Sequence, residues 1–296
     1  ILLSIAETLG RKLTEEECIN FVNKYIDKIE KEKSFCIVDI DNYNEKIIKS
    51  FIGNKQVHII DLNKYNIVNN SVYIDGKEEN LEAKFKELKK YIEGEKMYSN
   101  LKNIFLIGPS RAGKTTFAEM LQKLGYNHIV MDSVIETMME CFPESGIQHG
   151  NLESEEFKRF LKSFCQNTFK YGLPYVIDLE VLSPSFAKEL INEDESTVVY
   201  IGYPSLTPEE KLEQIREHDT KFDWTRNVND QELLRTLEGN IESSKLLKQG
   251  AKENNFEFLD VSNDRDRVFH DFIEEKTNRD NGFFYRSDKS YDRYER

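Results

Sequence analysis

The segment that most constrains the fold of this 296-residue chain is GPSRAGKT, at residues 108–115. It fits the pattern G-x-x-x-x-G-K-[ST], and it lies between an apolar stretch at 103–108 and a stretch with helical spacing at 114–124. A glycine-rich turn between a strand and a helix lets the backbone close around an anion, because successive N–H groups and the helix N-terminus face it. The segment therefore predicts a loop that holds nucleotide phosphates.

The pattern also assigns roles within this loop. We expect Lys114 to reach the β- and γ-phosphates and the Thr115 hydroxyl to bind Mg²⁺. The predicted cofactors are ATP and Mg²⁺, since no N-K-x-D sequence follows to indicate a guanine nucleotide. The predicted cofactor-binding residues are Gly108, Pro109, Ser110, Arg111, Ala112, Gly113, Lys114, Thr115 and Thr116.

From residue 101 onward, strand patterns alternate with helical patterns. Such alternation, with helices of about ten residues or more, predicts an α/β fold whose parallel sheet is covered on both faces. The expected strands are 103–108, 128–132, 174–180, 197–204 and 256–262, and the expected helices are 114–124, 133–141, 153–171, 184–192, 207–218 and 229–253. Residues 101–276 are therefore assigned to one domain.

The first 100 residues have a mixed pattern instead. A helical stretch with a capping box at Thr14 and Glu17 comes first, and strand-like runs follow at 34–40 and 56–62. A second helical pattern ends near Gly94. We expect residues 1–100 to form a small α+β domain, whose role the sequence does not indicate, and the polar residues 277–296 to form a C-terminal tail.

Charge and cysteine usage narrow the possible partners. Residues 101–276 contain 20 basic and 32 acidic side chains, whereas proteins that follow a nucleic-acid backbone present a basic stripe. A nucleic-acid partner is therefore disfavoured. The four cysteines form no C-x-x-C pair, which is typical of reduced thiols, and the five histidines show no metal-ligand spacing. No apolar run approaches the ~20 residues that span a bilayer, so we expect a cytoplasmic protein without a membrane segment.

Two acidic residues follow expected strands. Asp178 ends the apolar run YVID. In proteins with such a phosphate loop, a carboxylate at the end of an apolar strand holds Mg²⁺. Asp132 follows the strand after the loop, where the carboxyl ends of parallel strands line the ligand crevice. Its expected role is to accept the proton of an acceptor hydroxyl or to hold that hydroxyl in line with the γ-phosphate. With equal weight, Asp132 is expected to cap the next helix instead. Glu180 points to the same side as Asp178 if that strand continues.

The segment REHDTKFDWTRNVND, residues 216–230, precedes the last long helix. It combines Arg216, Lys221 and Arg226 with Trp224, the only tryptophan of the chain. Phosphoryl transfer uses mobile cations that close over the leaving group, and arginines contact phosphates in pairs of hydrogen bonds. We expect a lid in which Arg226 contacts the phosphates; a solvated loop anchored by Trp224 is the alternative.

Together, these motifs in residues 101–276 resemble the small P-loop kinases related to nucleoside monophosphate, shikimate and gluconate kinases. DWTRNVNDQELL followed by FEFLDVS is similar, more narrowly, to bacterial kinase-like ATP-binding proteins of unassigned substrate. The resemblance implies a five-stranded parallel sheet in the order 2-3-1-4-5, with ATP·Mg²⁺ at the loop and residues 262–264 beside the adenine. The stretch DSVIETMMECF is acidic where nucleotide kinases usually place a phosphate-binding arginine. A neutral or cationic acceptor with a hydroxyl group fits this lining better than a phosphorylated one.

The sequence leaves three functions open and indicates no oligomeric state. The first is an ATP-dependent P-loop kinase that transfers the γ-phosphate to a hydroxyl of a small molecule, with Lys114, Asp132 and Arg226 as catalytic residues and Thr115 and Asp178 as metal ligands. The second is a nucleotide-gated switch or sensor without such an acceptor. The third is a polynucleotide 5'-kinase, which the negative charge disfavours.

Overall fold

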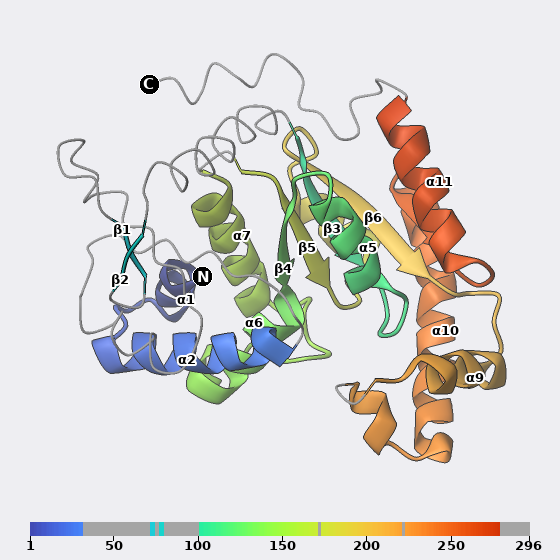
Figure 1. The fold of residues 1–296 in the computed structure, drawn as a ribbon, viewed down its shortest axis with the longest axis horizontal. Helices are drawn as coiled ribbons and strands as arrows, with labels where there is room; N and C mark the ends of the chain where they lie inside the picture. The colour runs from blue at the N-terminus through green and yellow to red at the C-terminus, as the bar shows by residue number, and fades with distance from the viewer. Residues whose placement is uncertain (32–71, 75–76, 80–100, 171–172, 221–222, 279–296) are drawn as a thin grey trace. The chain divides into compact units, whose positions relative to one another are not determined.

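The computed structural model describes residues 1–31, 72–74, 77–79, 101–170, 173–220 and 223–278 (Figure 1). The elements in chain order are α1 (Leu2–Leu9), α2 (Glu15–Lys31), β1 (Val72–Ile74), β2 (Lys77–Glu79), β3 (Asn103–Ile107), α5 (Lys114–Gln122), β4 (Asn127–Val130), α6 (Met131–Cys141), the 3₁₀ turn η2 (Pro143–Ser145), α7 (Glu155–Phe169), β5 (Tyr175–Leu179), α8 (Pro184–Leu190), β6 (Ser196–Gly202), α9 (Pro208–His218), the 3₁₀ turn η3 (Trp224–Asn227), α10 (Asp230–Glu253), β7 (Glu257–Asp260) and α11 (Arg265–Asn278).

Five strands form a parallel sheet in the order β4-β5-β3-β6-β7. Numbered from β3 along the chain, this is the order 2-3-1-4-5, so the predicted α/β fold and strand order are confirmed. The inner strands are nearly continuous apolar runs, NIFLI in β3 and YVIDL in β5, because both of their faces are covered.

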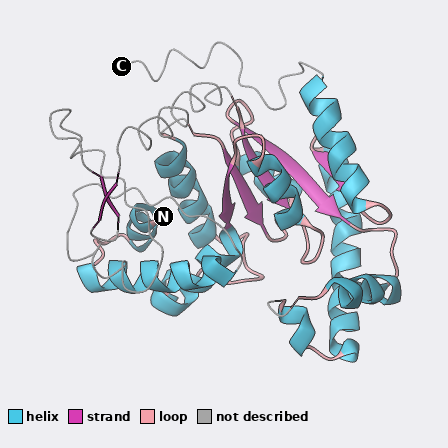
Figure 2. Cartoon of the chain, in the orientation of Figure 1, coloured by secondary structure: helices cyan, strands magenta, loops and turns pink. Residues whose placement is uncertain are grey.

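Helices cover the two faces of the sheet (Figure 2). On one face α5 packs against α11, where the ring of Phe117 stacks on that of Phe269 with centroids 4.6 Å apart. On the other face α10 lies against β6 and β7, and α8 contacts both α7 and α10. The backbone N–H of Tyr203 donates a hydrogen bond to Ser244 Oγ of α10 at 3.2 Å. These contacts fix the carboxyl end of β6, beside the phosphate loop.

The register of the sheet determines where a site can form. Val130 of β4 and Leu106 of β3 both pair with Asp178 of β5, so three neighbouring strands end at the same level. Ligands of open parallel sheets bind at this carboxyl edge. The phosphate loop follows β3, Asp132 lies two residues beyond Val130, and Glu180 lies two residues beyond Asp178. The chain therefore brings all three segments to one edge.

The two N-terminal helices pack against helices of the sheet domain. Helix α1 packs against α7, and α2 packs against α6, with the ring of Phe21 6.1 Å from that of Phe142. Residues 1–37 and 100–296 form one compact unit, and residues 38–99 form a second. This division differs from the boundary expected at residue 100, because the apolar side of α2 is buried against α6.

The second unit is described only in its antiparallel strand pair, β1 with β2. The strand patterns predicted at 34–40 and 56–62 and the helical pattern that ends near Gly94 lie outside the described residues, as does the tail beyond Asn278, the last residue of α11. Within the described ranges, every helix is too short or too polar to cross a bilayer.

Candidate functional site

The phosphate loop, residues 108–113, connects β3 to α5 as predicted. A Cβ atom on Gly108 would lie 2.1 Å from the carbonyl oxygen of Ile201 in β6, so only glycine fits there. Arg111 has a φ of 62°, in the left-handed region that strains side chains other than glycine. The hydroxyl of Tyr203 donates to the Ser110 carbonyl at 2.9 Å. The loop is thus held in its wrapped shape by β6.

Lys114, Thr115 and Asp178 meet at the start of α5. The Thr115 hydroxyl donates to Asp178 Oδ2 at 2.9 Å, and Lys114 Nζ lies 3.7 Å from Asp178 Oδ1. Burial raises the pKa of Asp178, but Lys114, His128 and Thr115 outweigh it and hold that pKa below its ordinary value. The carboxylate is therefore ionised, and its Oδ1 is buried without a hydrogen bond. A hydroxyl beside an ionised carboxylate is a donor set that suits Mg²⁺, so these residues fit the predicted ion.

Asp132 lies in the first turn of α6, whose N-cap is Val130. The expectation that Asp132 caps this helix is therefore wrong, because α6 begins two residues earlier than predicted. Burial raises the pKa of Asp132 to about 7; Lys114 opposes this shift, and the charge of Asp178 supports it. The Oδ1 atom of Asp132 is buried and has no hydrogen-bond partner.

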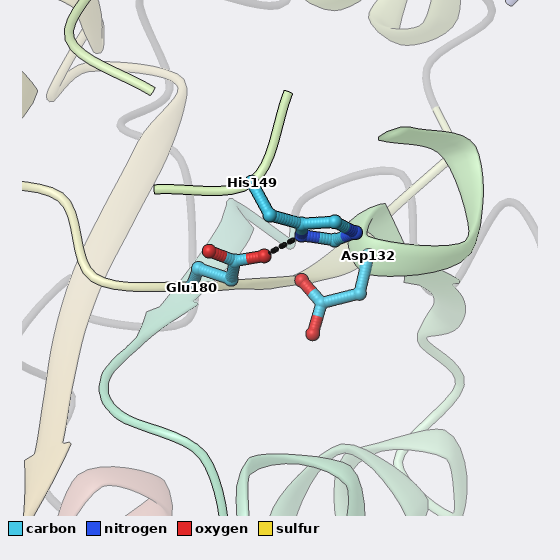
Figure 3. Close-up of side chains that lie close together, drawn as sticks. All are labelled: Asp132, His149 and Glu180. Atoms are coloured by element: carbon cyan, nitrogen blue, oxygen red, sulfur yellow. Dashed lines mark hydrogen bonds and ion pairs between the residues drawn. The ribbon is translucent and has the colours of Figure 1, made fainter. Parts of the chain in front are cut away.

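His149 and Glu180 complete an acidic flank of the phosphate loop, defined here as Asp132, His149 and Glu180 (Figure 3). His149 Nδ1 is hydrogen-bonded to Glu180 Oε1, and His149 Nε2 lies 4.0 Å from Glu136 Oε1. One ligand atom of each of the three flank residues lies within 4.8 Å of the others. The pairing raises the pKa of His149, chiefly through the hydrogen bond that the imidazole donates to Glu180.

The other side of the loop is a basic flank, defined as Arg111, Lys211 and Arg265. A Cβ on Gly113 would meet Arg265 Cδ at 2.7 Å, so Arg265 lies directly against the loop. Lys211 Nζ lies 4.4 Å from the ring centroid of Tyr203. Burial lowers the pKa of Lys211 to about 8, and the nearby charges of Arg265 and Arg111 add to this shift.

The predicted lid connects to the phosphate loop through Arg111. This arginine forms ion pairs with Asp219, at 3.0 Å, and with Asp223. The sequence reasoning singled out the cations of the lid, but here the lid supplies the carboxylates and the loop supplies the cation.

Arg216 and Arg226 of the lid differ in their contacts. Arg216 binds Asp230 at 2.7 Å and the carbonyl oxygens of Thr225 and Val228, each at 2.7 Å, so it supports the segment itself. Arg226 is exposed and makes no side-chain hydrogen bond or ion pair with the described part of the chain. Its predicted role on the phosphates stays a prediction. Trp224 is 48% exposed, which contradicts the alternative of a loop anchored by this tryptophan.

Sequence reasoning missed His149, Lys211 and Arg265. The first has no partner at metal-ligand spacing in the sequence, and only the chain path between η2 and α7 brings it to Glu180. The two cations come from α9 and α11, helices that follow two different strands. The sequence pointed to this part of the site only through the spacing of two residues between Asp178 and Glu180, which places both side chains on the same side of a strand end.

No protein-family model matches the sequence, and no curated protein matches it. A shikimate kinase from Acinetobacter baumannii in complex with shikimate is 19% identical, with a TM-score of 0.41, over 62% of this chain and 98% of that one. A gluconokinase from Sinorhizobium meliloti 1021 is 15% identical, with a TM-score of 0.42, over 60% and 92%.

A deoxyadenosine kinase from M. mycoides with bound dATP is 17% identical, with a TM-score of 0.33, over 60% of this chain and 100% of that one. Identities and TM-scores this low carry no argument about fold or activity. The resemblance to the fold of small P-loop kinases rests on the strand order and on the loop between β3 and α5.

Proposed function

We propose that this protein is an ATP-dependent phosphotransferase that moves the γ-phosphate of Mg·ATP to a hydroxyl group of a small molecule. The observation that carries the proposal is the position of Asp132, a partly buried carboxyl group whose Oδ1 is buried without a hydrogen-bond partner and which feels the charges of both Lys114 and Asp178. A group that accepts a proton thus lies beside the groups that are suited to a triphosphate and its metal ion.

The residues at the loop are proposed to have different roles. The backbone of residues 108–113 and the Lys114 ammonium bind the phosphates. Thr115 and Asp178 would hold Mg²⁺, which when bound neutralises charge that develops on the phosphate oxygens. Arg226 is proposed to reach the phosphates when the lid closes over them.

Asp132 is proposed to act on the acceptor. The acceptor oxygen forms a bond to the γ-phosphorus while the bond from that phosphorus to the bridging oxygen of ADP breaks. The hydroxyl proton passes to Asp132, and ADP leaves with the electron pair of the broken bond. A pKa raised to about 7 suits a general base that works near neutral pH.

The acceptor class follows from the charge around Asp132. Glu136 and Glu180 lie nearby, and Lys114 is the one lysine or arginine of the described residues among the largest charges that act on Asp132. A phosphorylated acceptor would meet repulsion there, so the proposal specifies a neutral or cationic molecule with a hydroxyl group. A cytoplasmic location and the lack of a nucleic-acid partner belong to the same proposal.

The test is a screen for ADP formation from Mg·ATP with pooled alcohols, sugars, nucleosides and aminoglycosides. For the acceptor that is found, Asp132→Asn should lower the rate of transfer by roughly 10²–10⁴-fold and leave ATP affinity unchanged. Glu140→Gln, an exposed change on the same helix, is the matched control and should keep full activity. Unchanged transfer in Asp132→Asn would remove its catalytic role. Slow ATP hydrolysis that no acceptor stimulates would favour the nucleotide-gated switch.

A further inference from the structure

The acidic flank brings together three candidate ligand residues from three separate segments. Asp132 comes from the first turn of α6, His149 from the loop between η2 and α7, and Glu180 from the residue after β5. One oxygen or nitrogen atom of each lies within 4.8 Å of the other two. Figure 3 shows the carboxyl group of Asp132 turned toward the imidazole of His149 and toward Glu180.

Asp132 gives an independent sign that a ligand binds here. Its Oδ1 is buried and unpartnered, although buried polar atoms of folded proteins nearly always have a hydrogen-bond partner. The neighbouring Glu180 cannot supply one, because its carboxylate has only acceptor oxygens and already binds His149. A cation between these groups would satisfy all of them together.

We propose that Asp132, His149 and Glu180 form a binding site for one divalent transition-metal ion, such as Zn²⁺ or Mn²⁺. The imidazole nitrogen separates this site from the all-oxygen set of Thr115 and Asp178, because Mg²⁺ prefers oxygen ligands and imidazole suits transition metals. The ion replaces the proton that His149 shares with Glu180, and the displaced proton goes to solvent.

The geometry requires only local adjustment. A tetrahedral ion with ligands at about 2.1 Å places its ligand atoms roughly 3.4 Å apart. Asp132 must therefore move closer to the other two residues, whereas the hydrogen-bonded atoms of His149 and Glu180 must move apart to admit the ion. Glu136 Oε1, 4.0 Å from His149 Nε2, is placed to orient the ring as an outer partner.

Three protein ligands leave a tetrahedral ion with one open position. This position would take a water molecule; while the ion is bound, Asp132 serves as its ligand and not as the proton acceptor of the proposed function. Metal binding itself does not rest on it, since neither nucleotide nor acceptor takes part.

The test uses the full chain without a histidine tag, treated with a chelator and dialysed, in the absence of nucleotide. Titration with Co²⁺, followed by visible absorption, and with Zn²⁺, followed by calorimetry, should show one equivalent bound. His149→Ala and Glu180→Gln should each weaken binding at least 10-fold. His270→Ala, which removes an exposed histidine of α11, is the matched control and should bind as the wild type does.

Two results would overturn the site. The first is no uptake of Co²⁺ or Zn²⁺ by the wild type, and the second is undiminished binding by His149→Ala, which would place the ion elsewhere. Circular dichroism shows whether each variant is folded. If His149→Ala or Glu180→Gln is unfolded, Asp132→Asn, which keeps the side-chain shape, is titrated in its place. Lys114→Ala should keep metal binding while it weakens ATP binding, so failure of this site and failure of the proposed function are seen in different measurements.

Discussion

The two sides of the phosphate loop differ in charge, although both border the same backbone. The basic flank, Arg111, Lys211 and Arg265, comes from the loop itself, α9 and α11. The acidic flank, Asp132, His149 and Glu180, comes from the first turn of α6, the loop before α7 and the residue after β5. In the proposed reaction, the basic flank faces the nucleotide and the acidic flank faces the acceptor.

The flanks share one physical feature. Each holds a buried ionisable group without a partner of opposite charge among the described residues, and burial shifts its pKa toward neutrality. The pKa of Asp132 rises to about 7, and that of Lys211 falls to about 8. A buried group that lacks a counter-ion within the protein is a candidate for contact with a ligand. The following predictions test whether the flanks act separately.

The largest effect is expected for Lys114→Ala, which removes the cation between the flanks. A hydrogen bond to a charged group contributes about 1.5–3 kcal/mol, so ATP affinity should fall roughly 10–100-fold. Calorimetric titration with Mg·ATP measures this loss. Lys123→Ala, at the exposed C-cap of the same helix, is the control and should bind ATP normally. Unchanged ATP affinity in Lys114→Ala would contradict the assignment of the loop.

The next effect concerns the pH dependence of stability on the acidic side. Because the folded-state pKa of Asp132 lies above its ordinary value of 3.8, the folded protein binds more protons than the unfolded chain between these values. Its contribution to the free energy of unfolding is therefore full below about pH 4 and is lost as the pH rises through 7.

Asp132→Asn removes the buried charge and should raise the free energy of unfolding at pH 8, without metal, by on the order of 1–3 kcal/mol. At pH 5 the two proteins should differ less. Urea unfolding at both pH values measures this, with Asp194→Asn, an exposed change, as the control. An equal difference at both pH values would show that Asp132 does not titrate in this range.

A smaller effect is expected where the loop meets the lid. Arg111→Gly relaxes the left-handed backbone, a gain of about 1 kcal/mol, but removes the ion pairs with Asp219 and Asp223. Partly exposed pairs contribute about 0.2–1 kcal/mol each, so the free energy of unfolding should change by less than about 1 kcal/mol.

Hydrogen exchange separates these opposing contributions. Amides of residues 223–228 should exchange several-fold faster in Arg111→Gly, because the lid loses its link to the loop. Asp223→Asn, which leaves the loop backbone unchanged, should have a similar but weaker effect. Exchange that stays at the wild-type rate in both variants would show that these ion pairs do not hold the lid.

The sequence was informative where local pattern and periodicity determine structure. Apolar strands alternating with helices predicted the sheet, and the spacing in GPSRAGKT predicted the loop, since each depends on residues close in the chain. Asp178 could be assigned because a strand that ends in an acid beside such a loop has one common geometry.

The two flanks depend instead on contacts between distant segments. His149 meets Glu180 only because the chain returns after η2 to the carboxyl edge of the sheet, and no spacing in the sequence reports this return. Helix α2 was likewise placed in a separate domain, because its amphipathic pattern shows that it needs a partner surface without showing which one. The pKa shifts of Asp132 and Lys211 arise from burial, which is a property of the whole fold.

The last prediction concerns Lys211→Met on the basic flank. Lys211 is 8% exposed, and a methionine keeps the packing of its aliphatic stem while removing a buried charge. The unfolded chain binds more protons than the folded one between pH 8 and 10.5, so wild-type stability rises over this range. Lys211→Met should therefore be more stable at pH 7, by about 1 kcal/mol, and lose this advantage near pH 10. Thermal unfolding at the two pH values measures the change, with Lys252→Met at an exposed position of α10 as the control. If Lys211 faces the nucleotide, Lys211→Met should also bind ATP a few-fold more weakly and keep its metal affinity. An equal loss of ATP affinity and metal affinity would mean that the two flanks do not act separately.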